Sequence, residues 1–489
     1  MLRTILPLRK IMQSTATLIA SLLILTSTAL AEDLTTPAYT EYNTFLGGVN
    51  FLELSSTGSS NVNANVAVYN LEGALRGSIS VTIPAGKQVD LDINSIVNTP
   101  DTYGLVKVTF NVSSTAKLRG RMATYSQNSN GSYSFAIAKE LRNASRRRTY
   151  AISNSFDAEG RGYVAPNWLS ITNLSSTNKT FTYRQYTPQG AIVRTSTVTL
   201  GSKQRRDIQA GHEDGEVVYL NEVEAPDSTT EYLSYITRYG TNSDPANFQN
   251  SPVYAIPLPT TTGTDGEQFT LISDREGDCW DQSNWLEVAN TDTITRNVYL
   301  SFRRQDGSIA SSTTMSIPAK NQFHFNATAL LRLSGNRNKY GVARIFSDTG
   351  SKILMQSTVY THSCNRSALQ TAFTVPSLQP ENFPISGSYN TFIDIHSRLF
   401  LLNTYRTTQS VTLALKHDGK EIYSNIFNFG AYQSQTLDLS DEATYSTAAD
   451  TIGTLSAGPA SIDNMIGFVV REHFANDATF DFAMPTPVQ

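Results

Sequence analysis

Apolar and polar residues alternate with a period of two along most of the chain. Such runs recur at corresponding places, as in Ala64-Val66-Val68, Val298-Leu300-Phe302 and Val411-Leu413-Leu415. Because successive side chains of a strand point to opposite faces, this alternation predicts strands with one face on a core. Runs at 106–110, 353–360 and 466–470 follow the same pattern. We expect about seven strands in each 100-residue unit, no long helix, and a short helical turn at 326–333.

The alternating runs belong to a unit that repeats about every 117 residues. Matching segments begin at Asn50, Asn167, Asn284 and Ser397, at spacings of 117, 117 and 113. A Gly between two runs recurs at 73, 190, 307 and 419, where it can supply the positive φ of a hairpin turn. A bend rich in small residues follows at 83–86, 200–203, 317–320 and 429–432. These landmarks keep one register, so the chain contains four copies of one module.

The repeat predicts an all-β fold of four tandem β-sandwich modules, Ig-like or transducer-like. The segment 42–45 recurs at 389–392, so a further element precedes each landmark Asn. Breaks are expected near 143–148, 257–265 and 376–384, where Pro, Gly, Thr or Arg gather. The predicted modules are 38–142, 149–258, 266–377 and 386–486.

The third module supplies the clearest order of elements. A strand at 286–290 ends in Asn290, an alternating strand at 298–307 leads into a turn, the bend Ile317-Pro318-Ala319 follows, and a strand covers 353–360. This order resembles the sensory-rhodopsin-transducer type of bacterial β-sandwich. The resemblance implies a small binding module without known enzymatic chemistry, and it transfers no catalytic residue. Pro318 has no counterpart in the second or fourth module.

The first 31 residues are predicted to be a cleaved signal peptide. Arg3, Arg9 and Lys10 form a basic segment, an apolar stretch covers 17–25, and Ala29-Leu30-Ala31 has the small residues of a cleavage site. We therefore expect a secreted, periplasmic or cell-surface protein. The apolar stretch is short for a membrane span, and we expect no transmembrane segment in the mature chain.

Charge and cysteine content narrow the range of partners. Only 16% of residues are charged, and loss of three basic residues with the signal peptide changes the net charge from −4 to −7. A mildly acidic chain without a cluster of basic residues is a poor candidate for a nucleic-acid-binding protein. Both cysteines, Cys279 and Cys364, fall in the third module, where export favours a disulfide between them; two free thiols are the alternative.

The search for catalytic chemistry is negative. The chain has no GxSxG, GxxxxGK[ST], HExxH or CxxC motif, and its six histidines show no metal-ligand spacing. We expect no catalytic residue, no metal and no cofactor. A pair of acids in a cleft cannot be found by sequence, so a secreted hydrolase with an unrecognised carboxylate site stays as a third hypothesis.

Three aromatic residues beside the landmark Asn are the candidate ligand site. If the flanking Leu-type residues face the core, Phe51, Trp168 and Trp285 point to the opposite face, where rings suit sugar stacking or a protein contact. The interpretation we favour is that each ring packs under a preceding segment or against the adjoining module. Arg398 at the fourth position argues against a uniform site.

The sequence therefore supports three functional hypotheses. The preferred one is an exported, non-catalytic structural or adhesive protein that acts by surface contact, as a rod or a curved array. The alternative is a carbohydrate-binding protein that uses the outward aromatics. The partner would be a glycan or a protein surface.

Overall fold

The computed structural model describes residues 34–488 apart from 112, 114, 128–132, 158–163, 242–251, 334–338, 364–367, 381–384, 460–463 and 476–478. The predicted signal peptide and Cys364 lie outside the described residues. The chain forms four β-sandwich modules, as the repeat predicts.

The four modules share one order of strands. Module 1 contains β1 (Ala38–Asn43), β2 (Gly48–Ser56), β3 (Val62–Asn70), β4 (Leu75–Ile83), β5 (Gln88–Asp92), β6 (Tyr103–Phe110), β7 (Leu118–Gln127) and β8 (Tyr133–Glu140). Module 2 contains β9 (Arg148–Asn154), β10 (Asn167–Asn173), β11 (Lys179–Tyr186), β12 (Ile192–Leu200), β13 (Arg205–Gln209), β14 (Val218–Glu224), β15 (Tyr232–Thr241) and β16 (Pro252–Pro259).

The other two modules follow the same plan, with one additional two-residue strand, β18, in module 3. Module 3 contains β17 (Gly266–Asp274), β18 (Glu276–Gly277), β19 (Trp280–Asn290), β20 (Arg296–Arg303), β21 (Ile309–Ile317), β22 (Gln322–Asn326), β23 (Lys339–Ser347), β24 (Ile353–Ser363) and β25 (Leu369–Pro376). Module 4 contains β26 (Ile385–Asn390), β27 (His396–Asn403), β28 (Gln409–His417), β29 (Lys420–Phe429), β30 (Ser434–Asp438), β31 (Ile452–Pro459), β32 (Met465–Ala475) and β33 (Thr479–Val488).

Short helical segments occupy equivalent connections between strands. They are η1 (Phe45–Gly47), α1 (Asn94–Val97), η2 (His212–Asp214), α2 (Ala327–Leu333), η5 (Phe392–Asp394) and α3 (Glu442–Tyr445). The helical turn predicted at 326–333 is therefore confirmed. Each module has at least eight strands, one more than predicted, because a strand of five residues such as β5 is too short to show a clear alternation.

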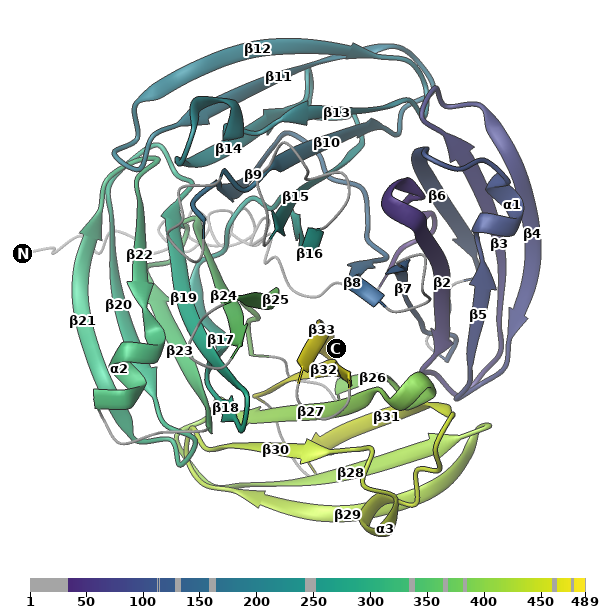
Figure 1. Ribbon diagram of the computed structural model, residues 1–489, viewed down its shortest axis with the longest axis vertical. Coiled ribbons are helices and arrows are strands. Elements are labelled where there is room, and N and C mark those ends of the chain that lie inside the picture. Colours follow the sequence, from purple (N-terminus) through teal and green to yellow (C-terminus); the bar gives the residue numbers. More distant parts are fainter. Residues whose placement is uncertain are drawn as a thin grey trace, which may run out of the picture.

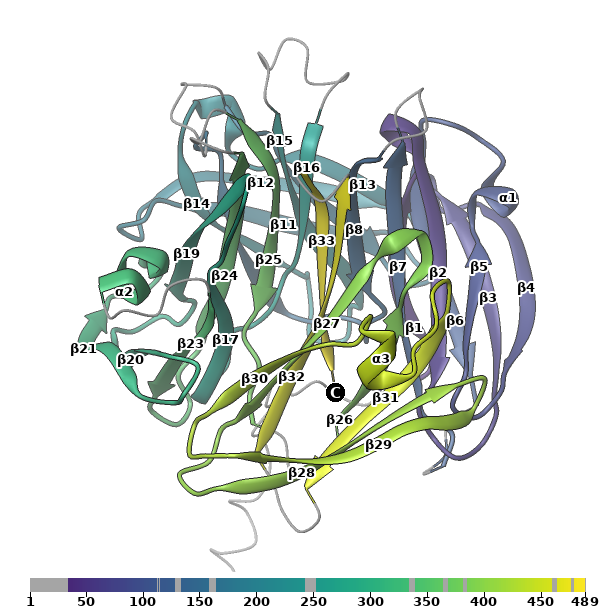
Figure 2. The same ribbon diagram turned by 60° about the horizontal axis from the view of Figure 1, so that its bottom comes forward.

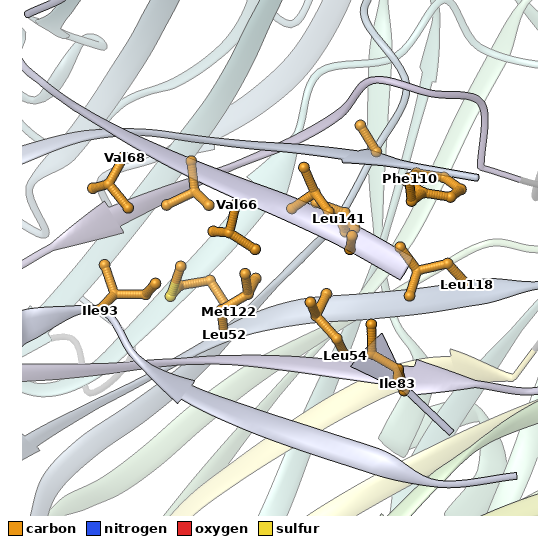
Figure 3. Close-up of a cluster of buried hydrophobic side chains, with 14 of the residues drawn as sticks. Leu52, Leu54, Val66, Val68, Ile83, Ile93, Phe110, Leu118, Met122 and Leu141 are labelled. Atoms are coloured by element: carbon orange, nitrogen blue, oxygen red, sulfur yellow. The ribbon is translucent and has the colours of Figure 1, made fainter. Parts of the chain in front are cut away.

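Each module pairs its strands into two antiparallel sheets. In module 1 the first sheet has the order β1-β6-β3-β4 and the second has the order β5-β2-β7-β8. The corresponding orders recur in the other modules. Between the two sheets lies a core of alternating residues, shown for module 1 in Figure 3, where Leu52, Leu54, Val66 and Val68 meet Met122. All five side chains are fully buried.

The landmark Asn of the repeat holds the two sheets together. In module 1 the Asn50 side chain accepts a hydrogen bond from the Asn43 backbone N–H at 3.1 Å and donates to the Asn43 carbonyl at 2.9 Å. Asn167 makes the same pair of contacts with Asn154 in module 2. The position is buried, so a side chain with both a donor and an acceptor is required there. The landmark is therefore explained by folding.

The four modules close into a ring around one axis (Figures 1 and 2). The last strand of each module, β8, β16, β25 or β33, lies at the centre, where each contacts the last strands of the two adjacent modules. The first sheet of one module packs against the second sheet of the next. Buried apolar clusters fill these interfaces, as where Phe269 and Leu271 of module 3 meet Phe400 and Phe468 of module 4. The chain thus forms a closed array instead of a rod.

Candidate functional site

Two of the predicted ligand-binding aromatics contact a neighbouring module. Phe51 points away from its own core, as predicted, and is half-buried beside a cluster that contains Tyr125 of module 1 and Phe482 of module 4. Trp168 is half-buried beside Phe135 and Ile137 of module 1. These rings pack between modules, which is the arrangement that the sequence analysis favoured over an open stacking platform.

Trp285 and Arg398, at the same position in modules 3 and 4, differ from Phe51 and Trp168 in their surroundings. Trp285 is 39% exposed. Arg398 is half-buried, and its Nε donates to Glu472 at 2.6 Å. The ring therefore distributes the four positions over separate places and does not bring the three aromatics together. Of the predicted residues, only Trp285 presents a substantial aromatic surface to solvent.

In the sequence, Cys279 comes directly before β19 and Cys364 comes directly after β24. Cys279 is exposed, and Cys364 lies outside the described residues. Trp280, which follows Cys279, pairs across the β19–β24 ladder with Ser363, which precedes Cys364. The disulfide stays a prediction, and this register is compatible with it.

The sequence analysis missed a set of buried ion pairs between modules. At each interface one carboxylate is fully or almost fully buried, and an arginine of the neighbouring module lies against it. The pairs are Glu41 with Arg205, Glu287 with Arg238, Glu472 with Arg275, and Glu53 with Arg471. Burial of charge is costly unless the geometry is good, so such pairs specify how elements meet more than they stabilise them.

The pair between modules 2 and 3 shows the geometry best. Arg238 donates from Nη1 and Nη2 to the two carboxylate oxygens of Glu287 at 2.8 and 2.7 Å, and Nη2 also donates to the Ile152 carbonyl at 2.8 Å. Gln356 donates to the same carboxylate. Burial alone would raise the pKa of Glu287, but the Arg238 guanidinium outweighs it and holds that pKa below its usual value.

The pair that closes the ring is its repeat equivalent. Glu53 and Glu287 stand at the same place in the repeat, and Arg471 donates from Nη1 to both oxygens of Glu53 at 2.8 and 3.0 Å. Arg121 of module 1 also donates to Glu53, at 2.6 Å. The recurrence of Glu three residues after Asn50 and Asn284 was the available signal. Alternation alone assigned these residues to the face away from the core, without revealing the adjoining module.

The glycine turns of the repeat dock one module onto the next. Gly73, Gly190, Gly307 and Gly419 all have φ between +76° and +87°, which confirms the predicted turn conformation. The turn of module 1 meets the bend of module 2, where the Arg205 N–H donates to the Leu71 carbonyl at 2.9 Å. The same bond joins Gln322 to Pro188 at 3.0 Å and Ser434 to Gln305 at 2.9 Å. The landmarks of the sequence are therefore the points of contact between modules.

The outer rim of the ring is an exposed feature that repeats in all four modules. It consists of β4, β12, β21 and β29, each the last strand of its sheet and exposed along most of its length (Figure 1). We call them the rim strands. Each carries at least one exposed apolar side chain, with 56% exposure at Ile192 and 61% at Ile426. Edge strands of this kind leave backbone donors and acceptors free for a partner.

The rim also carries a repeated pair of uncharged polar side chains. At equivalent places in the four modules, a residue of the rim strand shares a hydrogen bond with its neighbour on the adjacent strand: Thr82 with Asn63, Thr199 with Thr180, Ser316 with Asn297, and Asn428 with Ser410. In module 1 this surface forms a shallow groove of about 540 Å³. Its lining residues, which include Asn65, Ser80 and Thr109, carry no formal charge.

Reactive side chains are sparse in the described part of the chain. A Ser283 hydroxyl lies 3.1 Å from His362 Nε2, and His473 Nδ1 lies 2.9 Å from Asp481. No group of three or more His, Cys, Asp or Glu residues suited to a metal ion occurs among the described residues. None of the helices described is long and apolar enough to cross a membrane.

Comparison with known proteins identifies no family for this chain. The chain matches no protein-family model and no curated protein. Among solved structures it is similar to a tetra-tandem repeat in the extending region of a large adhesion protein, with 10% sequence identity over 94% of this chain and 98% of that chain, and a TM-score of 0.10. At this TM-score the two chains do not superpose as wholes, so no function is drawn from the similarity. The resemblance to transducer sandwiches stays a prediction.

Proposed function

We propose that the protein is an exported, non-catalytic structural or adhesive protein that acts through contact at its rim strands. The observation that supports this proposal is the fourfold repetition of one exposed edge with an uncharged, hydrogen-bonded polar pair. Four equivalent edges on one ring can bind a repetitive surface at several points, and such multivalent contact strengthens weak individual contacts. The proposal includes the cell exterior because the N-terminal segment has the pattern of a signal peptide.

A hydrolase role has less support. The groove of module 1 has no carboxylate among its lining residues. Glu53 and Glu140 share a cavity of only about 40 Å³, too small to admit a sugar ring. Arginine holds the pKa values of the buried interface residues Glu41, Glu287 and Glu472 below their usual value, which favours their ionised form over the role of a proton donor.

Binding of the intact protein to purified cell envelopes and to insoluble polysaccharide tests the proposal. Ile192→Lys and Ile426→Lys place a charge on two rim strands and are expected to lower the bound fraction severalfold. Phe156→Lys is the matched control, because Phe156 is 49% exposed but lies outside the rim strands. Equal binding by the rim variants and the control would contradict the proposal.

A second candidate function is carbohydrate binding through Trp285, and its support is the 39% exposure of that ring. Trp285→Ala is expected to abolish glycan binding if the ring is a stacking platform. Trp168→Ala serves as the comparison, because Trp168 packs against module 1. Retention of glycan binding in Trp285→Ala would exclude this candidate.

A further inference from the structure

The interface between modules 4 and 1 differs from the other three in how it is connected. Three linkers join the modules in sequence, so the chain crosses the interfaces 1–2, 2–3 and 3–4 but not the interface 4–1. We call this the closing interface. It can separate without any covalent change, while the modules at the other interfaces stay tethered and re-form their contacts within the same chain.

The docking turn fits less tightly at the closing interface. A Cβ atom placed on Gly73, Gly190 or Gly307 would lie 2.2–2.5 Å from a carbonyl oxygen of the next module, whereas at Gly419 the nearest oxygen, that of Ala85, is 3.2 Å away. Within the described part of the chain, the closing interface also lacks a counterpart of the backbone bond that joins each other turn to the next module. Lys87 forms an ion pair with Asp418 there instead, and the Asp418 side chain is 69% exposed.

The residues that face module 1 from β26 are small and polar. Ser386 stands where the first strands of the other modules carry the buried rings Tyr39, Tyr150 and Phe269. Ser386 and Ser388 line the cavity of about 40 Å³ together with Arg121, Glu140 and residues of β33. At this position, opening therefore exposes less apolar surface than at the equivalent position of the other interfaces. An apolar cluster that contains Tyr125 and Phe482 remains part of the closing interface.

Several buried polar atoms at the closing interface have no hydrogen-bond partner. They are Glu140 Oε1 and the Nε and Nη2 atoms of Arg471. Arg238 at the 2–3 interface leaves only its Nε without a partner, because both of its Nη atoms donate hydrogen bonds. A buried polar atom without a partner destabilises the contact that buries it. Opening would let water hydrate these atoms, which lowers the cost of separating modules 4 and 1.

We propose that the closing interface opens and that open chains join head to tail, with module 4 of one copy on module 1 of the next. An open chain exposes two surfaces that already fit one another, so the partner is a second copy of this chain. A contact of this heterologous kind produces larger rings or filaments. The proposal deepens the structural role proposed above by naming the partner. It does not depend on what the rim strands bind.

The charges around Glu140 give the exchange a dependence on pH. Glu140 faces Arg121, Arg119 and Glu53 of its own module, with Arg142 nearby, while β26 and β33 contribute only uncharged groups to the cavity. Burial, reinforced by Glu53 and opposed by Arg121, raises the pKa of Glu140 from 4.5 to about 7. The closed ring therefore binds an additional proton between these values. Its closure weakens as pH rises through this range, so the interface opens more often and joining is faster above pH 7. The contact between copies buries the same Glu140, so the final amount of joined chains does not share this dependence.

Size-exclusion chromatography with light scattering on the mature protein tests the proposal. Closure within one chain competes with joining, so samples near the mM range are required. Along a time course of incubation, wild type is expected to form whole-number multiples of the chain mass at least twofold faster at pH 8 than at pH 5.5. Glu53→Gln is expected to speed their formation at both pH values. Glu287→Gln, its repeat equivalent at a tethered interface, is expected to leave this rate unchanged while lowering thermal stability.

Two results would overturn the proposal. One is a single-chain mass for folded wild type and Glu53→Gln under all these conditions. The other is an equal increase of multiples in Glu53→Gln and Glu287→Gln. If Glu53→Gln does not fold, Glu140→Gln decides, because it must reduce the pH difference seen in wild type. Rim variants that keep their surface binding, in a protein that still forms multiples, would contradict the rim proposal alone.

Discussion

Each docking glycine is constrained in two ways, by its positive φ and by the lack of space for a Cβ atom. Gly190 has φ +80°, and a Cβ there would lie 2.5 Å from the Ala319 carbonyl oxygen. Gly190→Ala is therefore expected to lose about 1–3 kcal/mol through backbone strain, and more through the clash between modules 2 and 3. Gly419→Ala has the same backbone strain but a looser contact between modules, so only the loss from strain, about 1–3 kcal/mol, is expected. Urea unfolding of both variants measures the difference.

The informative result is which of Gly190→Ala and Gly419→Ala loses more free energy of unfolding. A larger loss for Gly419→Ala would mean that the closing interface is packed as tightly as the others. Gly350 gives a control, because it has φ +78° and no atom within 4 Å of a Cβ. Gly350→Ala is expected to report strain alone.

The cysteines give a second prediction at the residue scale. The register of Trp280 with Ser363 brings the residues next to Cys279 and Cys364 together. A disulfide in the exported protein would stabilise it by about 4 kcal/mol, the amount expected for a loop of this length. Peptide mapping without reductant is expected to recover the linked peptides, and Cys279→Ser is expected to lower the melting temperature. Recovery of free thiols alone would contradict the prediction.

Residue patterns predicted conformation better than they predicted partners. The turn glycines and the buried Leu52 and Leu54 followed from local rules, because φ and strand alternation are properties of neighbouring residues. The ion pair of Glu53 with Arg471 could not be predicted. Its two members are separated by most of the chain, and only the closed ring brings them into contact.

At the scale of single elements, the rim strands differ in how well they resist edge-to-edge aggregation. β4 and β12 carry an arginine and β29 carries Lys420 and Glu421, whereas β21 has no charged residue. An uncharged exposed edge pairs readily with another edge. Thr313→Lys is expected to slow aggregation on heating, as followed by light scattering. Thr313→Ser is the control, and an equal effect of both substitutions would exclude edge pairing through β21.

Element prediction succeeded where the pattern was long and failed where it was short. The alternating strands, the hairpins and α2 were predicted because each contains a full period of its pattern. The five-residue strands β5, β13, β22 and β30 lie at sheet edges and carry too few residues to show one. The outward aromatics were placed on the correct face of their strands, but alternation does not say whether that face meets water or another module.

At the scale of the whole molecule, the buried carboxylates predict a limited range of pH stability. Interactions with arginine hold the pKa values of Glu41, Glu287 and Glu472 below 4.5 despite burial. Their stabilisation is fully present above about pH 4.5 and is lost as pH falls through the lowered values. Glu140 acts in the opposite sense and destabilises closure as pH rises from 4.5 to about 7. Maximum stability is therefore expected near pH 5.

Thermal unfolding from pH 3 to 8 measures this dependence. Glu140→Gln is expected to reduce the decline between pH 5 and 7 and to leave the acid side unchanged. Burial also raises the pKa of Asp90 to about 7, so Asp90 accounts for a remaining part of this decline. Glu287→Gln is expected to reduce the acid dependence and to leave the decline above pH 5. An undiminished decline above pH 5 in Glu140→Gln would show that Glu140 is not responsible.

The sequence by itself determined the module. Alternation, turn glycines and the buried Asn of the repeat specify strands, hairpins and the sandwich, because these depend on residues that are close in the chain or within one core. Only the tertiary structure decided that four modules close into a ring, that Phe51 and Trp168 pack between modules, and that Glu53 meets Arg471. Those contacts depend on how whole faces meet, and a face that is polar by pattern can lie against solvent or against another copy of the module. The closing interface also could not be distinguished from the sequence. Its landmarks repeat those of the other interfaces, but its two faces pack less closely in the structure.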